Sequence, residues 1–291
     1  MSQAEVWSIG RLLQWTAEYL KNHGADSPRL DAEVLLAHTL ACRRIELYTS
    51  FERVPEEAVR SAFRELVRRR AAGEPVAYLV GRREFYSLSF QVSREVLIPR
   101  PETELLVVTL LDLAKERPGQ PLAVCDVGTG SGVLAVCAAK FLDCRVTAVD
   151  VSPAALDVAR ANAEAHGVAA RIDFACGDLL TELPPATAFD FILSNPPYVS
   201  ESEFQSLAPT VRDYEPRTAL VAGPHGTEVI ARLIPQAAER LSRGGHLLLE
   251  ISPMLHEAVA ALLGAEPLLE PGPTIKDLAR HPRVAQAKKK G

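Results

Sequence analysis

From residue 122 onward, short apolar segments typical of buried strands alternate with segments that have the spacing of helices. The clearest strand segments span residues 122–127, 145–149, 172–175, 189–193 and 246–251. This alternation predicts an α/β fold with a mostly parallel sheet and helices on both faces, because parallel strands need crossover connections. Sheets of this class bind ligands beyond the carboxyl ends of their strands. The residues that follow each strand are therefore the first candidates for a functional site.

The first of these strands runs into a glycine-rich turn, Gly128-Thr129-Gly130-Ser131-Gly132. Glycines let the backbone approach a ligand closely, and the predicted helix 133–141 would point its positive N-terminus at that ligand. Asp150 ends the second strand, at a position where a carboxylate can hold a ribose diol. A helix cap is the alternative role for Asp150, since Ser152-Pro153 follows it.

Asp178 follows the third strand, where its carboxylate or the neighbouring backbone could meet an adenine amino group. Together the three strand ends describe a groove shaped for a nucleoside. The groove could hold NAD, but a pyrophosphate cradle usually needs the spacing G-x-G-x-x-G. The third glycine here, Gly132, comes one residue too early for that pattern.

The fourth strand leads into Ser194-Asn195-Pro196-Pro197-Tyr198. Two prolines fix the backbone and remove two N–H donors, which leaves the Asn195 side-chain oxygen and the Pro196 carbonyl as acceptors. Tyr198 adds an aromatic face. Such a turn suits a planar group that carries an NH2, although a proline-rich turn without function is the alternative. With the nucleoside groove, it favours methyl transfer from S-adenosylmethionine to a planar nitrogen.

The chemistry explains why no strong base is expected. A planar NH2 has a delocalised lone pair, and two acceptors that hold both hydrogens can align the nitrogen with a methyl sulfonium. The sulfonium is already a strong electrophile. Catalysis is then mainly positioning and electrostatics, and no His or Glu is required as a base.

The region before residue 82 has helical spacing and no strand signal, so we predict a separate bundle of three helices. One helix face is basic, with Arg60, Arg64, Arg68, Arg69 and Arg70. It is interpreted either as a solvated face or as a contact for an acidic partner or RNA. Residues 84–92 alternate as a strand, and a turn at 93–95 predicts a hairpin with 96–98. The segment 199–216 is predicted to be a loop that becomes ordered on substrate binding.

Composition narrows the class of protein. The net charge is −5, which argues against a protein whose main role is to coat nucleic acid. The five cysteines are odd in number and show no C-x-x-C pair, so we expect a reducing cytosol with neither disulfides nor a zinc site. Neither a signal peptide nor a membrane span is expected, which predicts a cytoplasmic protein. The last two strands are predicted near 265–270 and 283–287, followed by a disordered tail at 288–290.

Two further stretches join the helical region to the alternating region: Gly81-Arg82-Arg83-Glu84-Phe85-Tyr86 and Leu97-Ile98-Pro99-Arg100-Pro101-Glu102-Thr103-Glu104. Together with the strand-end motifs, in the same order, these stretches resemble the glutamine methyltransferases of peptide-chain release factors (PrmC/HemK). Asp277 and Arg280 look like the last motif of that family. Leu179 stands where the family often has an aromatic residue, and Ser252-Pro253 stands where it usually continues with glycine.

The resemblance implies a Rossmann-like class I methyltransferase sheet of seven strands, the last antiparallel, with a small N-terminal helical bundle. It also implies a helical substrate-recognition domain at 1–82, a β-hairpin connector at 83–99 and a catalytic domain at 100–291. The implied substrate is the glutamine of the release factor's Gly-Gly-Gln loop, and the protein is expected to be a monomer without direct nucleic-acid binding.

The resemblance further implies a role for each strand-end motif. Asn195 and Pro196 would accept the amide hydrogens and Tyr198 would pack on the amide plane, which makes these three the expected catalytic residues, with Pro197 also contacting substrate. The expected cofactor-binding residues for S-adenosyl-L-methionine are Gly128, Thr129, Gly130, Ser131, Gly132, Asp150, Asp178, Leu179 and Asn195.

Two other functions fit parts of the sequence. A nucleic-acid methyltransferase acting on adenine or guanine amino groups would share the Asn-Pro-Pro-Tyr turn and could use the basic helix face. A cofactor-binding protein without catalysis would share the groove, but the intact Asn195 argues against it. Methyl transfer to a release factor, compared with DNA and tRNA, distinguishes these possibilities.

Overall fold

The computed structural model describes residues 6–117, 119 and 121–291. Residues 1–5 of the predicted helical domain, and residues 118 and 120 of the predicted catalytic domain, lie outside the described residues. The chain forms two compact units. The helical unit comprises Met1–Arg82 and Ala208–Tyr214, and the sheet unit comprises Arg83–Leu207 and Glu215–Gly291.

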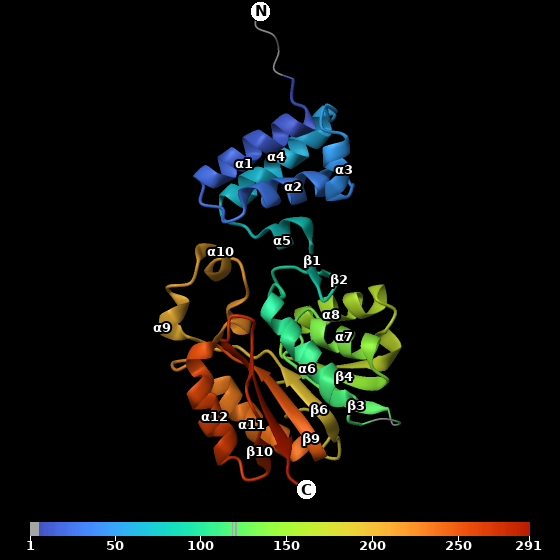
Figure 1. Cartoon of the computed structure of the whole chain (residues 1–291), viewed down its shortest axis with the longest axis vertical. Coiled ribbons are helices and arrows are strands. Elements are labelled where there is room, and N and C mark those ends of the chain that lie inside the picture. The colour runs from blue at the N-terminus through green and yellow to red at the C-terminus, as the bar shows by residue number, and fades with distance from the viewer. Residues whose placement is uncertain (1–5, 118, 120) are drawn as a thin grey trace, which may run out of the picture. The chain divides into compact units, whose positions relative to one another are not determined.

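The helical unit is built of short helices (Figure 1), and their buried side chains form an apolar core. Its helices are α1 (Ile9–Asn22), α2 (Pro28–Thr39), α3 (Arg44–Thr49), α4 (Glu57–Ala71), α5 (Val76–Val80) and the short α10 (Pro209–Arg212). The spacing of apolar residues explains the packing, since Ile9, Leu13 and Leu20 share one face of α1 and are buried. The three predicted helices are present as α1, α2 and α4, and α3 and α5 are shorter than the window in which helical spacing can be recognised.

Each arginine of the basic face of α4 has an acidic partner within the helical unit. Arg60 and Arg64 lie near Glu57, and Arg68 bonds Glu65 at 2.7 Å. The last two arginines also have acidic partners, as Arg69 bonds Glu74 at 2.7 Å and Arg70 bonds Asp31 at 2.8 Å. This pairing favours the solvated-face interpretation over contact with RNA.

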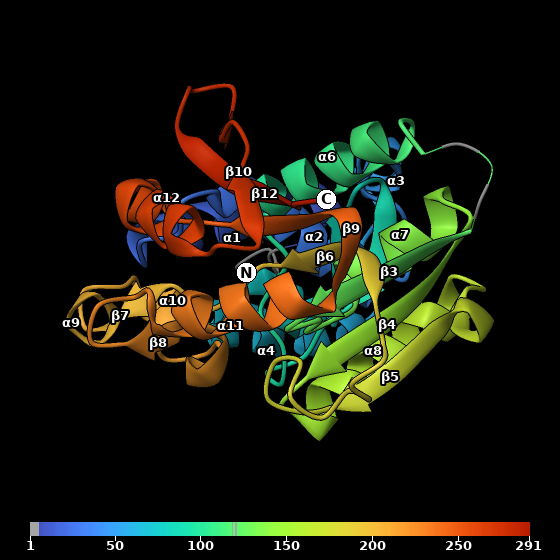
Figure 2. The same cartoon turned by 90° about the horizontal axis from the view of Figure 1, so that it is seen from below.

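The sheet unit has a mixed sheet with the strand order β10-β12-β9-β6-β3-β4-β5, and these strands follow one another across Figure 2 from β12 to β5. The strands are β3 (Leu122–Val127), β4 (Cys144–Asp150), β5 (Ile172–Cys176), β6 (Phe189–Ser194), β9 (Leu241–Glu250), β10 (Leu269–Pro271) and β12 (Pro282–Lys289), while the short β11 (Ile275–Lys276) pairs with β12 outside this path. From β5 to β9 all pairs are parallel, and β12 is antiparallel to β9. The predicted mostly parallel sheet with an antiparallel last strand is confirmed, and the predicted count of seven holds for the strands along this path, to which β11 adds an eighth.

Helices cover both faces of this sheet because neighbouring residues of the buried strands point to opposite sides. Val124 packs into one core and Val127 into the other. The first core is covered by α6 (Glu104–Ala114), α7 (Val133–Phe141) and part of α8 (Pro153–Ala165), and the second by α11 (Glu228–Arg240) and α12 (His256–Ala265). Shorter elements complete the unit: β1 (Arg82–Phe85), β2 (Leu88–Gln91), β7 (Val199–Ser200), α9 (Glu201–Phe204), β8 (Val221–Gly223), and four 3₁₀ turns, η1 (Pro101–Thr103), η2 (Ala169–Arg171), η3 (Arg217–Ala219) and η4 (Pro253–Leu255).

The connector is a hairpin, but its turn was placed wrongly by the sequence pattern. The turn lies at Tyr86-Ser87, between β1 and β2, and the segment 96–98 forms no strand. Tyr86 and Ser87 have positive φ angles of 48° and 59°, as two-residue hairpin turns require. Tyr86 N–H donates to Glu104 Oε1 at 2.9 Å, which anchors the turn to the start of α6. The alternating pattern runs through this turn without an Asn-Gly or Asp-Gly signal, so the sequence does not reveal it.

Three expectations for the remaining chain are corrected. The tail predicted as disordered at 288–290 is largely strand, because Lys288 pairs with His246 of β9 and with Glu270 of β10. The strand predicted at 265–270 begins later, at Leu269, since α12 continues to Ala265. The segment 199–216 holds β7, α9 and α10 in place of a structureless loop. Among the described residues, helices long and apolar enough to cross a membrane are absent.

One buried side chain joins the hairpin, α8 and the glycine-rich turn. Asn162 has no exposed surface, and its Oδ1 accepts from Gln91 N–H at 2.7 Å. Its Nδ2 donates to Gln91 O at 3.0 Å and to Ser131 O at 2.8 Å. Asn162 therefore takes the place of a neighbouring strand for β2 and holds the turn that ends at Gly132.

We expect Asn162→Ala to lower the free energy of unfolding by about 2–4 kcal/mol, because three backbone groups, of which Ser131 O is buried, lose their partner. Urea unfolding followed by circular dichroism measures the change. Glu164→Ala on an exposed position of α8 is the matched control and should change stability by less than about 0.5 kcal/mol. Equal losses in both variants would contradict the role given to Asn162.

Candidate active site

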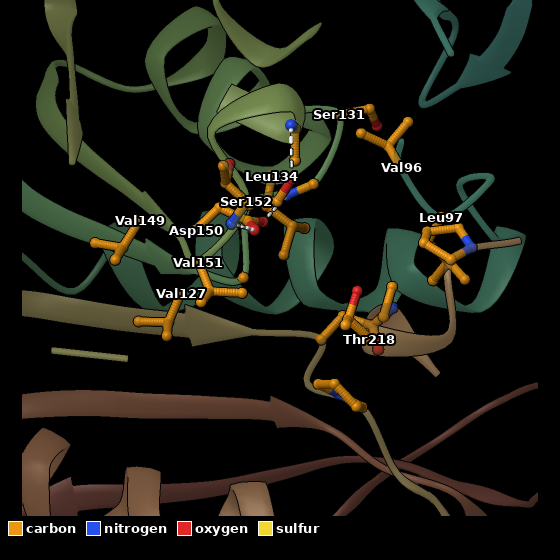
Figure 3. A pocket seen from close by; sticks show the side chains of 18 of the residues that line it. Val96, Leu97, Val127, Ser131, Leu134, Val149, Asp150, Val151, Ser152 and Thr218 are labelled. Atoms are coloured by element: carbon orange, nitrogen blue, oxygen red, sulfur yellow. Dashed lines mark hydrogen bonds between the residues drawn. The ribbon is translucent and has the colours of Figure 1, made fainter. Parts of the chain in front are cut away.

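A cavity of about 200 Å³ lies beyond the carboxyl ends of β3, β4, β5 and β6 (Figure 3). This is the point at which the strand order reverses, between β3 and β6, and where open α/β sheets bind ligands. Its lining includes the predicted residues Gly128, Thr129, Gly130, Ser131, Asp150, Asp178, Leu179, Asn195 and Pro197. The described lining residues do not include Gly132, Pro196 or Tyr198, which lie in the same two turns. In Figure 3, Asp150, Ser152 and Leu134 cluster on one side of the cavity, whereas Leu97 and Thr218 lie on the other.

The glycine-rich turn is held open by its backbone. Gly128, Gly130 and Gly132 have φ angles of 74°, 53° and 81°, a region that other residues rarely adopt. The N–H groups of Gly128 and Thr129 donate to Val149 O at 2.8 and 2.9 Å, which fixes the turn to β4. A Cβ on Gly132 would lie 3.1 Å from Ala159 Cβ, so α7 and α8 can meet here only without a side chain.

Both oxygens of Asp150 accept backbone hydrogen bonds, one of them from the glycine-rich turn. Oδ2 accepts from Gly130 N–H at 2.9 Å, and Oδ1 accepts from Ser152 N–H at 2.9 Å. The N-cap of α8 is Ser152, whose hydroxyl accepts from Ala155 N–H, so the helix-cap alternative for Asp150 is wrong. Each carboxylate oxygen has a second lone pair, which leaves Asp150 able to accept bonds from a ligand in the cavity.

The loop after β5 is fixed by α11. Arg232 forms an ion pair with Asp178 through Oδ2, and Gln236, one turn further along α11, accepts from Leu180 N–H at 3.0 Å. Leu179, between these two contacts, has a φ of 57° in the left-handed region. Arg232 also lines the cavity. The sequence gives no signal for Arg232 or Gln236, because their partners are more than fifty residues away.

The turn after β6 presents an unpaired acceptor. Asn195 Nδ2 donates to Thr103 Oγ1 at 3.1 Å, whereas Asn195 Oδ1 is buried and has no hydrogen-bond partner among the described residues. Pro196 is buried, and Tyr198 is partly buried. Burial, assisted by the negative charge of Glu250, raises the pKa of Tyr198 to about 12, so the phenol stays neutral. An unsatisfied buried acceptor at a cavity is a position prepared for a donor.

Two buried carboxyl groups lie close to this cavity. Asp126 accepts from Thr129 Oγ1 at 2.6 Å and from Ala135 N–H at 3.1 Å, and burial raises its pKa to about 7. Glu250 ends β9, beside β6, and burial likewise raises its pKa to about 7. The sequence did not single out Thr103 or Glu250 for a role, although a charged residue that ends an apolar run is a detectable signal.

Asp277, of the predicted last motif, is linked to Glu250 through Arg283. Asp277 Oδ2 accepts from Arg283 Nε at 2.9 Å, and the charge of Arg283 opposes the rise that burial causes in the pKa of Glu250. Arg280 is exposed and its φ is 68°. Asp277 therefore acts on the site by holding Arg283, and Arg280 lies outside the cavity lining among the described residues.

Comparison with known proteins finds family models and relatives that agree with one another. Residues 11–81 match the model of the PrmC N-terminal domain, and residues 101–210 match the methyltransferase small domain. The chain is 50% identical over 288 residues to a release factor glutamine methyltransferase of Rhodopirellula baltica, with 97% of each chain covered. It is 44% identical over 252 residues to one of Nitratidesulfovibrio vulgaris, covering 86% of this chain and 84% of the relative.

A solved structure supports the fold. The catalytic domain of hMettl16, determined in complex with the MAT2A 3'UTR hairpin 6, has a TM-score of 0.55 to this chain. It covers 77% of this chain and 82% of its own, at 20% sequence identity. At this identity the likeness concerns the fold alone.

We expect Gly132→Ala to destabilise the protein more than Gly128→Ala. Both residues have a positive φ, which costs an alanine about 1 kcal/mol. Only the Gly132 position adds a contact, because the new methyl would press on the Ala159 backbone at 3.2 Å and overpacking costs about 1–3 kcal/mol more. Chemical unfolding of the two variants measures the difference. Equal losses of stability would contradict the prediction and show that α8 can move away from the new methyl group.

Proposed function

The chain belongs to the release factor glutamine methyltransferase family, and from this premise we propose how its own residues carry out the reaction. The protein transfers a methyl group from S-adenosylmethionine to the side-chain amide nitrogen of a glutamine in peptide-chain release factors. The glutamine is that of the Gly-Gly-Gln motif, as the resemblance of the signature residues implies. The observation that carries the proposal is the buried, unpaired Oδ1 of Asn195 beside the cavity.

The cavity suits S-adenosylmethionine by two features. Three positive-φ glycines leave room for the backbone to approach the methionine part, and Asp150 keeps lone pairs for the ribose hydroxyls. Asp178 and Leu179 would flank the adenine. When bound there, S-adenosylmethionine supplies a methyl group on a positively charged sulfur, which makes that carbon electrophilic.

Asn195 and Pro196 would hold the glutamine amide. Asn195 Oδ1 accepts one N–H and the Pro196 carbonyl accepts the other, so the nitrogen turns toward the cofactor cavity. Tyr198 packs against the flat amide and stays neutral, as its raised pKa supports. Positive charge develops on the nitrogen in the transition state as it bonds to the methyl carbon. Two fixed acceptors on its N–H groups stabilise that charge.

The reaction then needs no strong base. As the nitrogen gains the methyl carbon, the donor's carbon–sulfur bond would break and one of the two amide protons would leave to water, while Asn195 and Pro196 would hold the nitrogen in position. Both N–H groups point at acceptors throughout, so the departing proton lies along an existing hydrogen bond. Holding the amide nitrogen in contact with the methyl group in this way can supply much of the rate enhancement of the reaction.

The two units have separate proposed roles. The predicted division into residues 1–82, 83–99 and 100–291 remains our proposal, with the helical part recognising the release factor. The paired arginines of α4 support the expectation that nucleic acid is not a direct partner. We also propose that the protein acts as a monomer.

The choice of substrate is tested with purified components. We expect mass spectrometry to locate one added methyl group on the Gly-Gly-Gln glutamine of a release factor incubated with enzyme and S-adenosylmethionine. A release factor with Glu in place of that glutamine is the control and should stay unmodified, because it has no amide nitrogen. Labelling of DNA or tRNA in place of the release factor would contradict the proposal.

The division of roles within the site is tested by a pair of variants with opposite signatures. We expect Asn195→Ala to lower the maximal rate about 100-fold, as loss of a transition-state hydrogen bond does, with a much smaller effect on cofactor affinity. We expect Asp150→Ala to weaken cofactor binding about tenfold or more, as loss of a charged hydrogen-bond acceptor does. Calorimetry and single-turnover rates separate the two effects.

Asp157→Ala on α8 is the control for Asp150→Ala, since Asp157 is exposed and pairs with Arg160 at the surface. Its cofactor affinity should equal that of the unaltered protein. An Asn195→Ala variant with undiminished methyl transfer would refute the role given to Asn195.

A further inference from the structure

We propose that Thr103 and Glu250 are positioning residues that fix, through one chain of hydrogen bonds, which end of the Asn195 amide faces the glutamine. The inference rests on the function proposed above, in which Asn195 Oδ1 accepts a substrate N–H. An asparagine amide has an oxygen at one end and an NH2 at the other, and the two ends have nearly the same shape. Packing alone therefore cannot select the oxygen, and hydrogen-bond direction must do so.

Thr103 has an unusual place for its hydroxyl. It is the last residue of η1, its backbone is helical and runs on into α6, and its side chain makes no cap bond to the helix. Its Oγ1 accepts from Asn195 Nδ2 at 3.1 Å, and its hydroxyl lies near enough to Glu250 to lower the pKa of that carboxyl group. Glu250 Oε2 is buried and has no hydrogen-bond partner among the described residues, so an acceptor is available to the Thr103 hydroxyl. Thr103 and Glu250 are each 3% exposed, so little water can compete for these bonds.

Glu250 sets the direction of the chain. An ionised carboxylate can only accept, and a hydroxyl has a single proton, so Thr103 must donate that proton to Glu250. Thr103 Oγ1 is then left as an acceptor for Asn195, and only the NH2 end of the amide can bond to it. Asn195 Oδ1 therefore turns away from Thr103, and it is the buried oxygen without a partner among the described residues.

Loss of the negative charge removes this constraint. A protonated Glu250, or a glutamine in its place, can itself donate to Thr103. Thr103 can then donate to the asparagine oxygen, which allows the amide to rotate by half a turn. The Asn195 NH2 would face the NH2 of the substrate, and two donors form no hydrogen bond.

The charges around Glu250 come from several elements. Glu102 lies in η1, and Arg100 is the residue directly before η1. Arg283 lies in β12, and Tyr198 lies in the turn after β6. Glu215 engages Arg100 at 2.5 Å, and Asp277 engages Arg283 at 2.9 Å, so both cations are already paired.

These surroundings give the chain a dependence on pH. Burial is the largest cause that raises the pKa of Glu250 to about 7, with Glu102 adding to it, whereas Thr103, Arg283 and Arg100 oppose the shift. Thr103 donates to Glu250, as the proposed orientation of Asn195 requires, only when the Glu250 carboxylate is ionised. The maximal rate should therefore be low below this pKa and rise as the pH increases through about 7.

The test measures single-turnover methyl transfer to a purified release factor, with cofactor and release factor saturating, from about pH 6 to about pH 9. Thr103→Val keeps the shape and removes the hydroxyl, and we expect a maximal rate about 10- to 100-fold lower with cofactor affinity unchanged. Thr103→Ser restores the hydroxyl and should recover most of that rate. Glu250→Gln should lower the rate and abolish its rise near pH 7.

Thr109→Val is the matched control. Thr109 is also a buried threonine, but its hydroxyl donates to Leu105 O at 2.7 Å within α6. Its removal should leave the rate and the pH profile unchanged, and thermal unfolding of every variant identifies those that are merely unstable.

Three results would overturn the inference: an unchanged rate in Thr103→Val, an unchanged rise near pH 7 in Glu250→Gln, or equal losses in Thr103→Val and Thr103→Ser. The last would assign the effect to packing. Absence of methyl transfer by the unaltered protein would refute the proposed function itself, which distinguishes the two failures.

Discussion

The active site depends on the register between two parallel strands. Val127 of β3 is directly opposite Ser194 of β6, and the Ser194 hydroxyl donates to Val127 O at 2.7 Å. These are the last residues of both strands, so the glycine-rich turn and the Asn-Pro-Pro-Tyr turn start side by side. A shift by one residue would move every side chain of β6 to the opposite face. The proposed cofactor cavity and the proposed substrate acceptors are adjacent only because this register holds.

Burial of charge is the second constraint. Asp126 and Glu250 are both almost fully buried near the site, which is costly for a carboxylate unless hydrogen bonds compensate. Asp126 receives two such bonds, from Thr129 and Ala135, and thereby ties the turn to α7. The same low-polarity surroundings strengthen each hydrogen bond that remains. A site without a strong base can use these fixed dipoles, since its task is to orient an amide and stabilise developing charge.

The sequence predicts the parts of this site that are encoded locally. Strand alternation, the three glycines and the polar residue after each strand are all read from neighbouring positions, and the cavity brings most of them together. Thr103, Asn162, Arg232 and Glu250 were missed because their roles depend on partners far away in the chain. The Tyr86-Ser87 turn was missed because its residues lack the usual turn chemistry, and the strand at Lys288 because neighbouring strands, and not its own composition, order it.

The adenine side of the cavity shows how distant contacts replace a local signal. Leu179 adopts a left-handed conformation that is unfavourable for a residue with a side chain. Arg232 and Gln236 of α11 hold the residues on either side of Leu179. These contacts keep the loop in a conformation that it would not adopt alone. Both partners in the Arg232–Asp178 pair are about half exposed, and such a pair adds little free energy. Its effect is to orient the carboxylate: Oδ2 is engaged by Arg232, and the other oxygen can meet an adenine amino group. The wall of the proposed adenine site is therefore a property of where α11 packs as much as of the loop itself.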